Sequence, residues 1–202
     1  MEIEHADVRW VSHGWDLGDV WCLTFVRGLT EAEALRRTGA VEESIRPLSY
    51  AELVDKGLFP GTVLAGRLGD WVVLIGRNQG RAPDSAAVSA LSRGTEMVSV
   101  LRHDYASDYF IYAVDGDEVT GFDPRKPAWR YGSDPERLLE EMGHAGLDPA
   151  YPPSDDDEWD ESVVHRPAVD GALVLAARLA GVAFTHEVLH GPLTGGRRAQ
   201  GD

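Results

Sequence analysis

Several residue types are scarce in this chain, and each scarcity argues against a class of protein. Cysteine occurs once, as Cys22, so the chain cannot form an internal disulfide, which is typical of the reducing cytoplasm. No apolar run approaches the roughly 18 residues that span a bilayer. The N-terminal segment MEIEHADVRW is charged and lacks the apolar core of a signal peptide. We therefore expect a cytoplasmic protein without a membrane-spanning segment.

Basic residues are also scarce. The 202 residues include 19 Lys and Arg against 34 Asp and Glu, which gives a formal net charge of −15. A field of this sign repels phosphate groups, so nucleic acids and anionic membranes are disfavoured as partners, and basic proteins are favoured. The plain alternative is that the acidic surface only keeps the protein soluble. Two lysines and one asparagine indicate a GC-rich coding sequence rather than a function.

Motifs of common nucleotide-binding and nucleophilic sites are missing. Gly28 stands between an apolar run and a capped helix, but no second glycine and no lysine complete a phosphate-binding loop. No G-x-S-x-G motif is present. Cys22 lies in an apolar segment, which is typical of a small buried hydrophobe with a raised pKa.

Three aspartates lie close together in the sequence and could hold a hard cation or perform acid–base chemistry. Asp115 and Asp117 flank a glycine, however, and Asp123 precedes a proline, which is typical of turns. We therefore predict no catalytic residue, no cofactor and no bound metal.

Apolar runs and capping residues predict an α+β fold with a mostly antiparallel β-sheet, flanking helices and a C-terminal helical hairpin. Strands are expected at residues 20–26, 62–67, 71–75, 96–102, 109–114 and 118–122. Helices are expected after the caps Thr30, Ser49, Asp84 and Ser133, over residues 167–184, and around Val188 and Leu189.

Four segments are expected along the chain. Residues 1–150 form the sheet domain, and residues 151–162 form a linker rich in aspartate and glutamate. Residues 163–193 form a helical segment, and residues 194–202 form a flexible tail rich in glycine and arginine. The sequence leaves open whether the helical segment packs on its own domain or on a second chain.

Six tryptophans are spread over the chain, and we expect Trp21 and Trp71 to lie in the core. Trp129 stands between two turn signals, so we expect it to be partly exposed. A mixture of Trp, Tyr and Arg is enriched at binding hot spots. The candidate interaction residues are Arg125, Trp129, Arg130, Tyr131 and, in the acidic linker, Trp159. The alternative is that Trp129 only covers the end of the sheet.

His186, Glu187 and His190 spell H-E-x-x-H, the zinc-binding signature of metalloproteases. Such sites need a third protein ligand, and residues 191–202 contain no further His or Glu. An upstream ligand such as His103, His144 or His165 would be an unusual order. Gly191 and Pro192 also end the helix at once. We therefore interpret the motif as a short helix capped by Thr185.

Five segments together resemble an uncharacterised actinobacterial family of domain-of-unknown-function proteins. They are WCLTFVRGLTEAEALRRTGA, LGDWVVLIGRNQG, LSRGTEMVSVLRH, YAVDGDEVTGFDP and ALVLAARLAGVAFTHEVL. The resemblance covers most of the chain and implies a cytoplasmic protein without an assigned activity. In that family the counterpart of residues 185–189 usually carries proline at the position of His186, which counts against an inherited zinc site.

These observations favour a non-enzymatic protein-interaction module that binds a basic partner, similar in charge and size to immunity and antitoxin proteins. The alternative from another class is a zinc-dependent hydrolase that uses His186, Glu187 and His190. A third alternative is mimicry of a nucleic acid by the acidic residues 155–161. Self-association of identical chains stays open.

Overall fold

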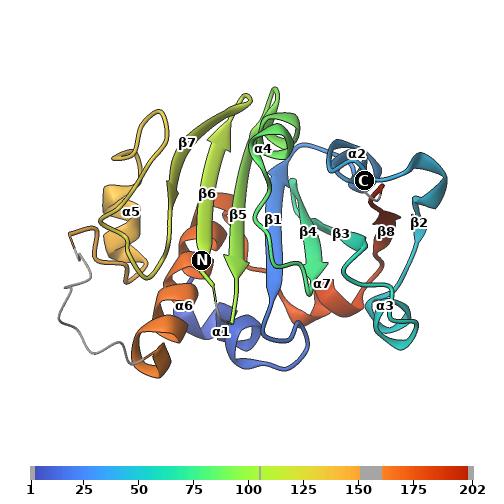
Figure 1. Cartoon of the computed structure of the whole chain (residues 1–202), viewed down its shortest axis with the longest axis horizontal. Coiled ribbons are helices and arrows are strands. Elements are labelled where there is room, and N and C mark those ends of the chain that lie inside the picture. The colour runs from blue at the N-terminus through green and yellow to red at the C-terminus, as the bar shows by residue number, and fades with distance from the viewer. Residues whose placement is uncertain (1–2, 105, 151–160, 200–202) are drawn as a thin grey trace.

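One antiparallel β-sheet forms the centre of the protein (Figure 1). The computed structural model describes residues 3–104, 106–150 and 161–199. The eight strands lie in the order β2-β8-β3-β4-β1-β5-β6-β7. They are β1 (Trp21–Arg27), β2 (Arg46–Pro47), β3 (Thr62–Leu68), β4 (Trp71–Arg77), β5 (Glu96–Arg102), β6 (Tyr109–Val114), β7 (Asp117–Phe122) and β8 (Thr194–Arg197). The predicted α+β class and antiparallel sheet are confirmed.

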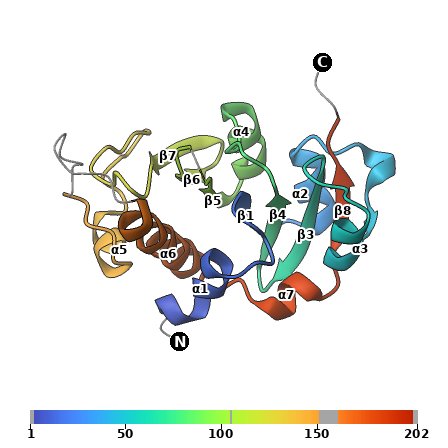
Figure 2. The ribbon, with the colours of Figure 1, turned by 60° about the horizontal axis from the view of Figure 1, so that its bottom comes forward.

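Helices cover both faces of this sheet (Figure 2). One face carries α1 (His5–His13), α3 (Tyr50–Asp55), α5 (Leu139–His144), α6 (Glu161–Ala180) and α7 (His186–His190). The other face carries α2 (Glu31–Arg37) and α4 (Ser85–Ser92), and a 3-10 turn, η1 (Glu42–Ser44), precedes β2. None of the described helices is both long and apolar enough to cross a membrane.

Burial on both faces explains the uninterrupted apolar run of β1. Successive side chains of a strand point to opposite faces, so Trp21, Leu23 and Phe25 join the core under α6, and Val26 joins the core under α2 and α4. Trp21 and Trp71 are both buried, as expected. The central strands therefore need apolar residues at every position instead of an alternating pattern.

α6 packs on its own domain, through α1, β5 and β1. The carboxylate of Asp170 is buried between α6 and α1, where it accepts hydrogen bonds from Ser12 and from His13 Nε2 at 3.1 Å. The expected linker overlaps this helix, because α6 begins at Glu161. Residues 151–160, which include Trp159, lie outside the described residues.

Residues 194–197, which we expected in a flexible tail, form β8 between β2 and β3. The two glycines that suggested flexibility serve close packing: a Cβ at Gly195 would lie 2.4 Å from Leu48 Cδ2, and one at Gly196 would lie 2.9 Å from Ala40 Cβ. α7, directly before β8, packs against β3 and α3. α6 and α7 therefore cover different strands of the sheet instead of forming a separate helical hairpin.

Candidate functional site

The H-E-x-x-H segment forms α7, a helix of five residues that the sheet holds in place. Its Thr185 hydroxyl accepts a hydrogen bond from Val188 N, which confirms the predicted cap. Leu189 is fully buried and anchors the helix to the core. His186, Glu187 and His190 are exposed. The helix thus presents both histidines to solvent from a fixed base.

Asp16 joins the two histidines from the loop between α1 and β1. One ligand atom of each of Asp16, His186 and His190 lies within 4.8 Å of those of the other two. His186 Nδ1 lies 3.7 Å from Asp16 Oδ2. The structure therefore places an aspartate carboxylate, and not an upstream histidine or a downstream glutamate, beside the two histidines.

Of the upstream histidines considered as third ligands, none that the structure describes lies in this group. His103 is buried after β5, where its Nδ1 lies 3.3 Å from an Asp104 carboxylate oxygen. His144 is exposed at the end of α5. The side chain of His165 lies outside the described part of the chain. No local pattern marks Asp16, because its position depends on packing between distant segments.

Trp10 fixes the ring of His186 from one side. The two ring centroids are 3.9 Å apart, with 31° between the planes. The indole Nε1 of Trp10 donates to Phe184 O at 3.2 Å, just before α7. The indole therefore links α1 to the segment that carries the histidines.

Tyr50 of α3 connects the other two members of the group. Its ring meets the His190 ring edge-on, with centroids 5.7 Å apart, and its hydroxyl donates to Asp16 O. Arg77 Nη1 donates to the same hydroxyl at 3.0 Å. Partial burial raises the pKa of Tyr50, so the phenol keeps its proton and can act as this donor.

A second candidate site is the loop of residues 123–134 that follows β7, called the aromatic loop below. Trp129 is 59% exposed and Tyr131 is 44% exposed. The backbone of Tyr131 pairs with Gly121 through two hydrogen bonds of 2.8 and 2.9 Å, so the loop adds a rung to the outer edge of β7. Partial burial and the neighbouring Glu118 carboxylate raise the pKa of Tyr131 to about 12.

The two arginines predicted to bind a partner hold this loop together. Arg125 is buried, and its guanidinium donates to Asp123 and to Ala106 O. Arg130 is half-buried and donates to Pro149 O at 2.7 Å. Of the candidate interaction residues that the structure describes, Trp129 and Tyr131 are the exposed ones.

The three aspartates near β7 all accept hydrogen bonds within the fold. Asp115 has a positive φ of 49° in the β6–β7 turn, and its Oδ1 accepts from Gly94 N at 2.9 Å. Asp117 accepts from the Ser133 hydroxyl. Asp123 Oδ1 accepts from Arg125 N at 2.9 Å. The turn interpretation therefore fits Asp115 and Asp123, whereas Asp117 begins β7 and connects it to the aromatic loop.

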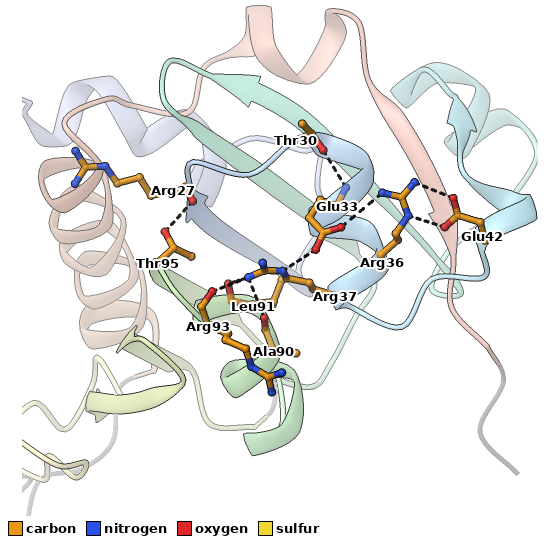
Figure 3. A network of polar contacts seen from close by, with 10 residues as sticks. All are labelled: Arg27, Thr30, Glu33, Arg36, Arg37, Glu42, Ala90, Leu91, Arg93 and Thr95. Atoms are coloured by element: carbon orange, nitrogen blue, oxygen red, sulfur yellow. Dashed lines mark hydrogen bonds and ion pairs between the residues drawn. The ribbon is translucent and has the colours of Figure 1, made fainter.

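A network of carboxylates and arginines joins α2, the helix that follows the phosphate loop considered at Gly28, to α4 and to Glu42 (Figure 3). Thr30 caps α2 by accepting from Glu33 N, and the Glu33 carboxylate contacts Arg36 and Arg37. Arg37 Nη1 reaches the main-chain oxygens of Ala90, Leu91 and Arg93 at the end of α4. A carboxylate in the first turn of α2 disfavours an anion there, so this network is structural.

Cys22 is buried, and burial raises the pKa of its thiol despite hydrogen bonds from Ser99 and Thr24. The thiol therefore stays protonated near neutral pH, as expected for a small core residue.

A family model described as a family of unknown function (DUF6461) matches residues 1–192. The chain belongs to this family. The match confirms the predicted relation to an uncharacterised domain family, and it spans both candidate sites of this DUF6461 protein. No curated protein and no solved structure matches the chain.

Proposed function

We propose that this DUF6461 protein is a non-enzymatic interaction module that binds a basic protein through the aromatic loop. The observation that supports this most is the pair Trp129 and Tyr131, which are exposed although their loop is fixed. The backbone of Tyr131 is hydrogen-bonded to β7, and buried Arg125 holds the base of the loop. A pre-ordered loop loses little conformational entropy on binding, so exposed aromatic rings on it contribute more to affinity.

The charge around the aromatic loop supports a basic partner. Exposed carboxylates between residues 104 and 150 belong to Asp104, Asp115, Asp117, Asp134, Glu136, Glu140, Glu141 and Asp148. Among Lys and Arg in the described part of this stretch, Arg137 alone is exposed. Opposite charges speed the encounter of two proteins and align them, whereas like charges reject wrong partners.

Two features support the cellular setting of this proposal. A single buried cysteine suits a reducing cytoplasm, and the amino-acid usage suits an actinobacterial source. The size and acidic charge are those of immunity and antitoxin proteins, and that comparison rests on charge and size alone. A complex between identical acidic chains would bring like charges together.

Quantitative capture from a native lysate tests the interaction. Wild-type protein and a Trp129→Ala variant serve as baits, followed by affinity measurement with the purified partner. We expect a basic protein whose dissociation constant rises by roughly 30-fold or more in the variant, which corresponds to a hot-spot contribution of about 2 kcal/mol. Binding should also weaken as the salt concentration rises.

Trp15 provides the matched control, because it is 89% exposed and lies in the loop between α1 and β1. Trp15→Ala should leave the affinity unchanged. A lysate in which no captured protein depends on Trp129 would contradict the proposal, and so would equal losses in both variants.

A zinc-dependent hydrolase is the second candidate, and the approach of Asp16 to His186 and His190 favours it. In such enzymes the Glu of the motif acts as general base on metal-bound water. Glu187→Gln should then abolish zinc-dependent cleavage of an unfolded protein substrate. The absence of zinc-dependent cleavage by the wild-type chain would remove this candidate.

A further inference from the structure

We propose that Asp16, His186 and His190 form a binding site for one divalent transition-metal ion, with zinc as the preferred ion. The site lies where α7 meets the loop between α1 and β1. α7 packs on β3, which is far from β7 in the strand order of the sheet. It is independent of the aromatic loop, and it requires no hydrolase activity.

The donor set determines the class of ion. Two imidazole nitrogens and one carboxylate oxygen suit zinc and its first-row neighbours, whereas magnesium and calcium prefer sites made of oxygen ligands. Three protein ligands leave one or more coordination positions to water. The exposed histidines are open to solvent on this side, so an ion can enter without opening the fold.

The separations between the three ligand atoms are somewhat larger than those around a bound zinc ion. A tetrahedral zinc with bonds of about 2.0–2.1 Å holds its ligand atoms roughly 3.4 Å apart. The pair His186 Nδ1 and Asp16 Oδ2 is already at 3.7 Å, and all three ligand atoms lie within 4.8 Å. Closure to the spacing around a bound ion shortens the ligand separations by up to about 1.4 Å, and rotations of the partly exposed side chains of Asp16 and His186 can supply this.

Neighbouring aromatic residues limit where the ligands can point. The Trp10 indole lies against the His186 ring, and the Tyr50 ring meets His190 edge-on. The hydroxyl of Tyr50 holds the main chain at Asp16. Residues from α1 and α3 thus orient ligands that come from two distant parts of the sequence.

An ion pair between His186 and Asp16 is the simpler interpretation of their contact. That contact does not involve His190, which lies one helical turn further along α7 with its ring nearly parallel to that of His186, at 7° between planes and 6.2 Å between centroids. A ligand atom of each imidazole also lies within 4.8 Å of the other and of an Asp16 carboxylate oxygen, a clustering that an ion pair of two residues does not require.

Zinc titration of the full chain tests the proposal. The protein is purified without a histidine tag, stripped with a chelator and titrated with zinc chloride by isothermal calorimetry. We expect one zinc ion per chain. Single variants His186→Ala and His190→Ala should weaken binding by more than about 100-fold, because even the loss of a second-shell partner weakens metal sites by about 10–100-fold.

Two control variants should leave zinc binding unchanged. His144→Ala removes an exposed histidine on α5, and Trp129→Ala removes the exposed ring of the aromatic loop. Both should bind zinc as the wild type does. Trp129→Ala separates this proposal from the interaction proposal, because it should weaken partner binding by roughly 30-fold or more and leave zinc binding intact.

Cobalt(II) gives a readout that does not depend on stability. Cobalt(II) in a four-coordinate site absorbs visible light far more strongly than hydrated cobalt(II), and we expect this stronger absorption in the wild type and not in His186→Ala. Two results would overturn the proposal. One is the absence of stoichiometric zinc binding by the wild type, and the other is equal binding by wild type, His186→Ala and His190→Ala.

Discussion

At the scale of the residue, Leu189 connects the exposed histidines to the core. Its side chain is fully buried, while Glu187, two positions earlier in α7, is exposed. Such a short helix is held by its packing and not by its own hydrogen bonds. The geometry of the proposed metal site therefore depends on a residue that cannot itself bind metal.

Leu189→Ala should lower the free energy of unfolding by about 2–5 kcal/mol, because it leaves a cavity under α7. Glu187→Ala, on the exposed side of the same helix, should change it by less than about 0.5 kcal/mol. Urea denaturation of the metal-free proteins measures both. Equal stability of the two variants would show that α7 is not anchored through Leu189.

Tyr131 should give the protein a specific loss of stability at alkaline pH. The pKa of Tyr131 is raised from 10.0 to about 12 in the folded state. The unfolded chain therefore releases this proton first, so the contribution of Tyr131 is complete below pH 10 and is lost between pH 10 and pH 12.

Denaturation at several pH values checks this. Stability should fall less steeply between pH 10 and 12 in Tyr131→Phe than in the wild type. Tyrosinate absorbance should also show one late-titrating phenol fewer in the variant. Identical slopes in the two proteins would contradict the raised pKa.

At the scale of the element, regular strands and capped helices could be predicted from local patterns. The hairpin of β3 and β4, the hairpin of β6 and β7, and the caps Thr30, Ser49 and Asp84 lie where the sequence placed them. The cap predicted at Ser133 is wrong, because α5 begins only at Leu139, with Leu138 at its N-cap. The short elements η1 and β2 were not predicted, and neither were α1 and β8. α1 has a capping box formed by Glu4 and Asp7, a signal that is present but weak. β8 contains two glycines, which from the sequence alone indicate a flexible segment. In the structure Gly195 instead allows the close approach of Leu48.

The candidate site could be predicted only in part, for the same reason. His186 and His190 are one helical turn apart, so a local motif identifies them. Asp16 comes close to them only when α1 packs on α6 and Trp10 packs on His186. These contacts join opposite ends of the sequence. No periodic pattern in a single sequence predicts this contact between Asp16 and the two histidines.

The bridge between α2 and α4 predicts different effects for two adjacent arginines. Arg37 is mostly buried and reaches three main-chain oxygens of α4, whereas Arg36 pairs with Glu42 in solvent (Figure 3). Arg37→Ala should cost about 1–2 kcal/mol of unfolding free energy, because it removes charge-assisted hydrogen bonds. Arg36→Ala should change stability much less.

Chemical denaturation compares the two variants, and hydrogen exchange at the C-terminal end of α4 locates the effect. Faster exchange there is expected for Arg37→Ala alone. The same exchange rates in both variants would show that Arg37 does not hold the two helices together.

Gly195→Ala tests the role of β8 as a packed strand. The added methyl group would lie 2.4 Å from Leu48 Cδ2, so we expect a loss of about 1–3 kcal/mol in the free energy of unfolding. Thr194→Ala, at the neighbouring half-buried position, serves as the control and should cost less. Gly195→Ala with wild-type stability in urea denaturation would mean that residues 194–197 do not pack as a strand.

At the scale of the whole molecule, the sheet is shared by two cores, and α6 belongs to one of them. The buried Asp170 contacts tie α6 to α1, and β8 ties the following segment to β3. We therefore expect residues 163–197 to unfold together with the sheet domain and not as a separate unit.

Urea unfolding followed by tryptophan fluorescence and by far-ultraviolet circular dichroism tests this expectation. A single transition with the same midpoint for both signals is predicted, because two-state behaviour requires one cooperative unit. Two separate transitions would instead support an independent C-terminal segment.

The place of β8 in the sheet also affects synthesis. A chain emerges from the ribosome N-terminus first, at about 5–20 residues per second, and local units fold as they appear. β3 and β4 can pair early, but the outer edge of β3 has no partner until residues 194–197 arrive. During this interval the nascent chain exposes an unpaired strand edge, the kind of surface to which chaperones and other growing chains bind.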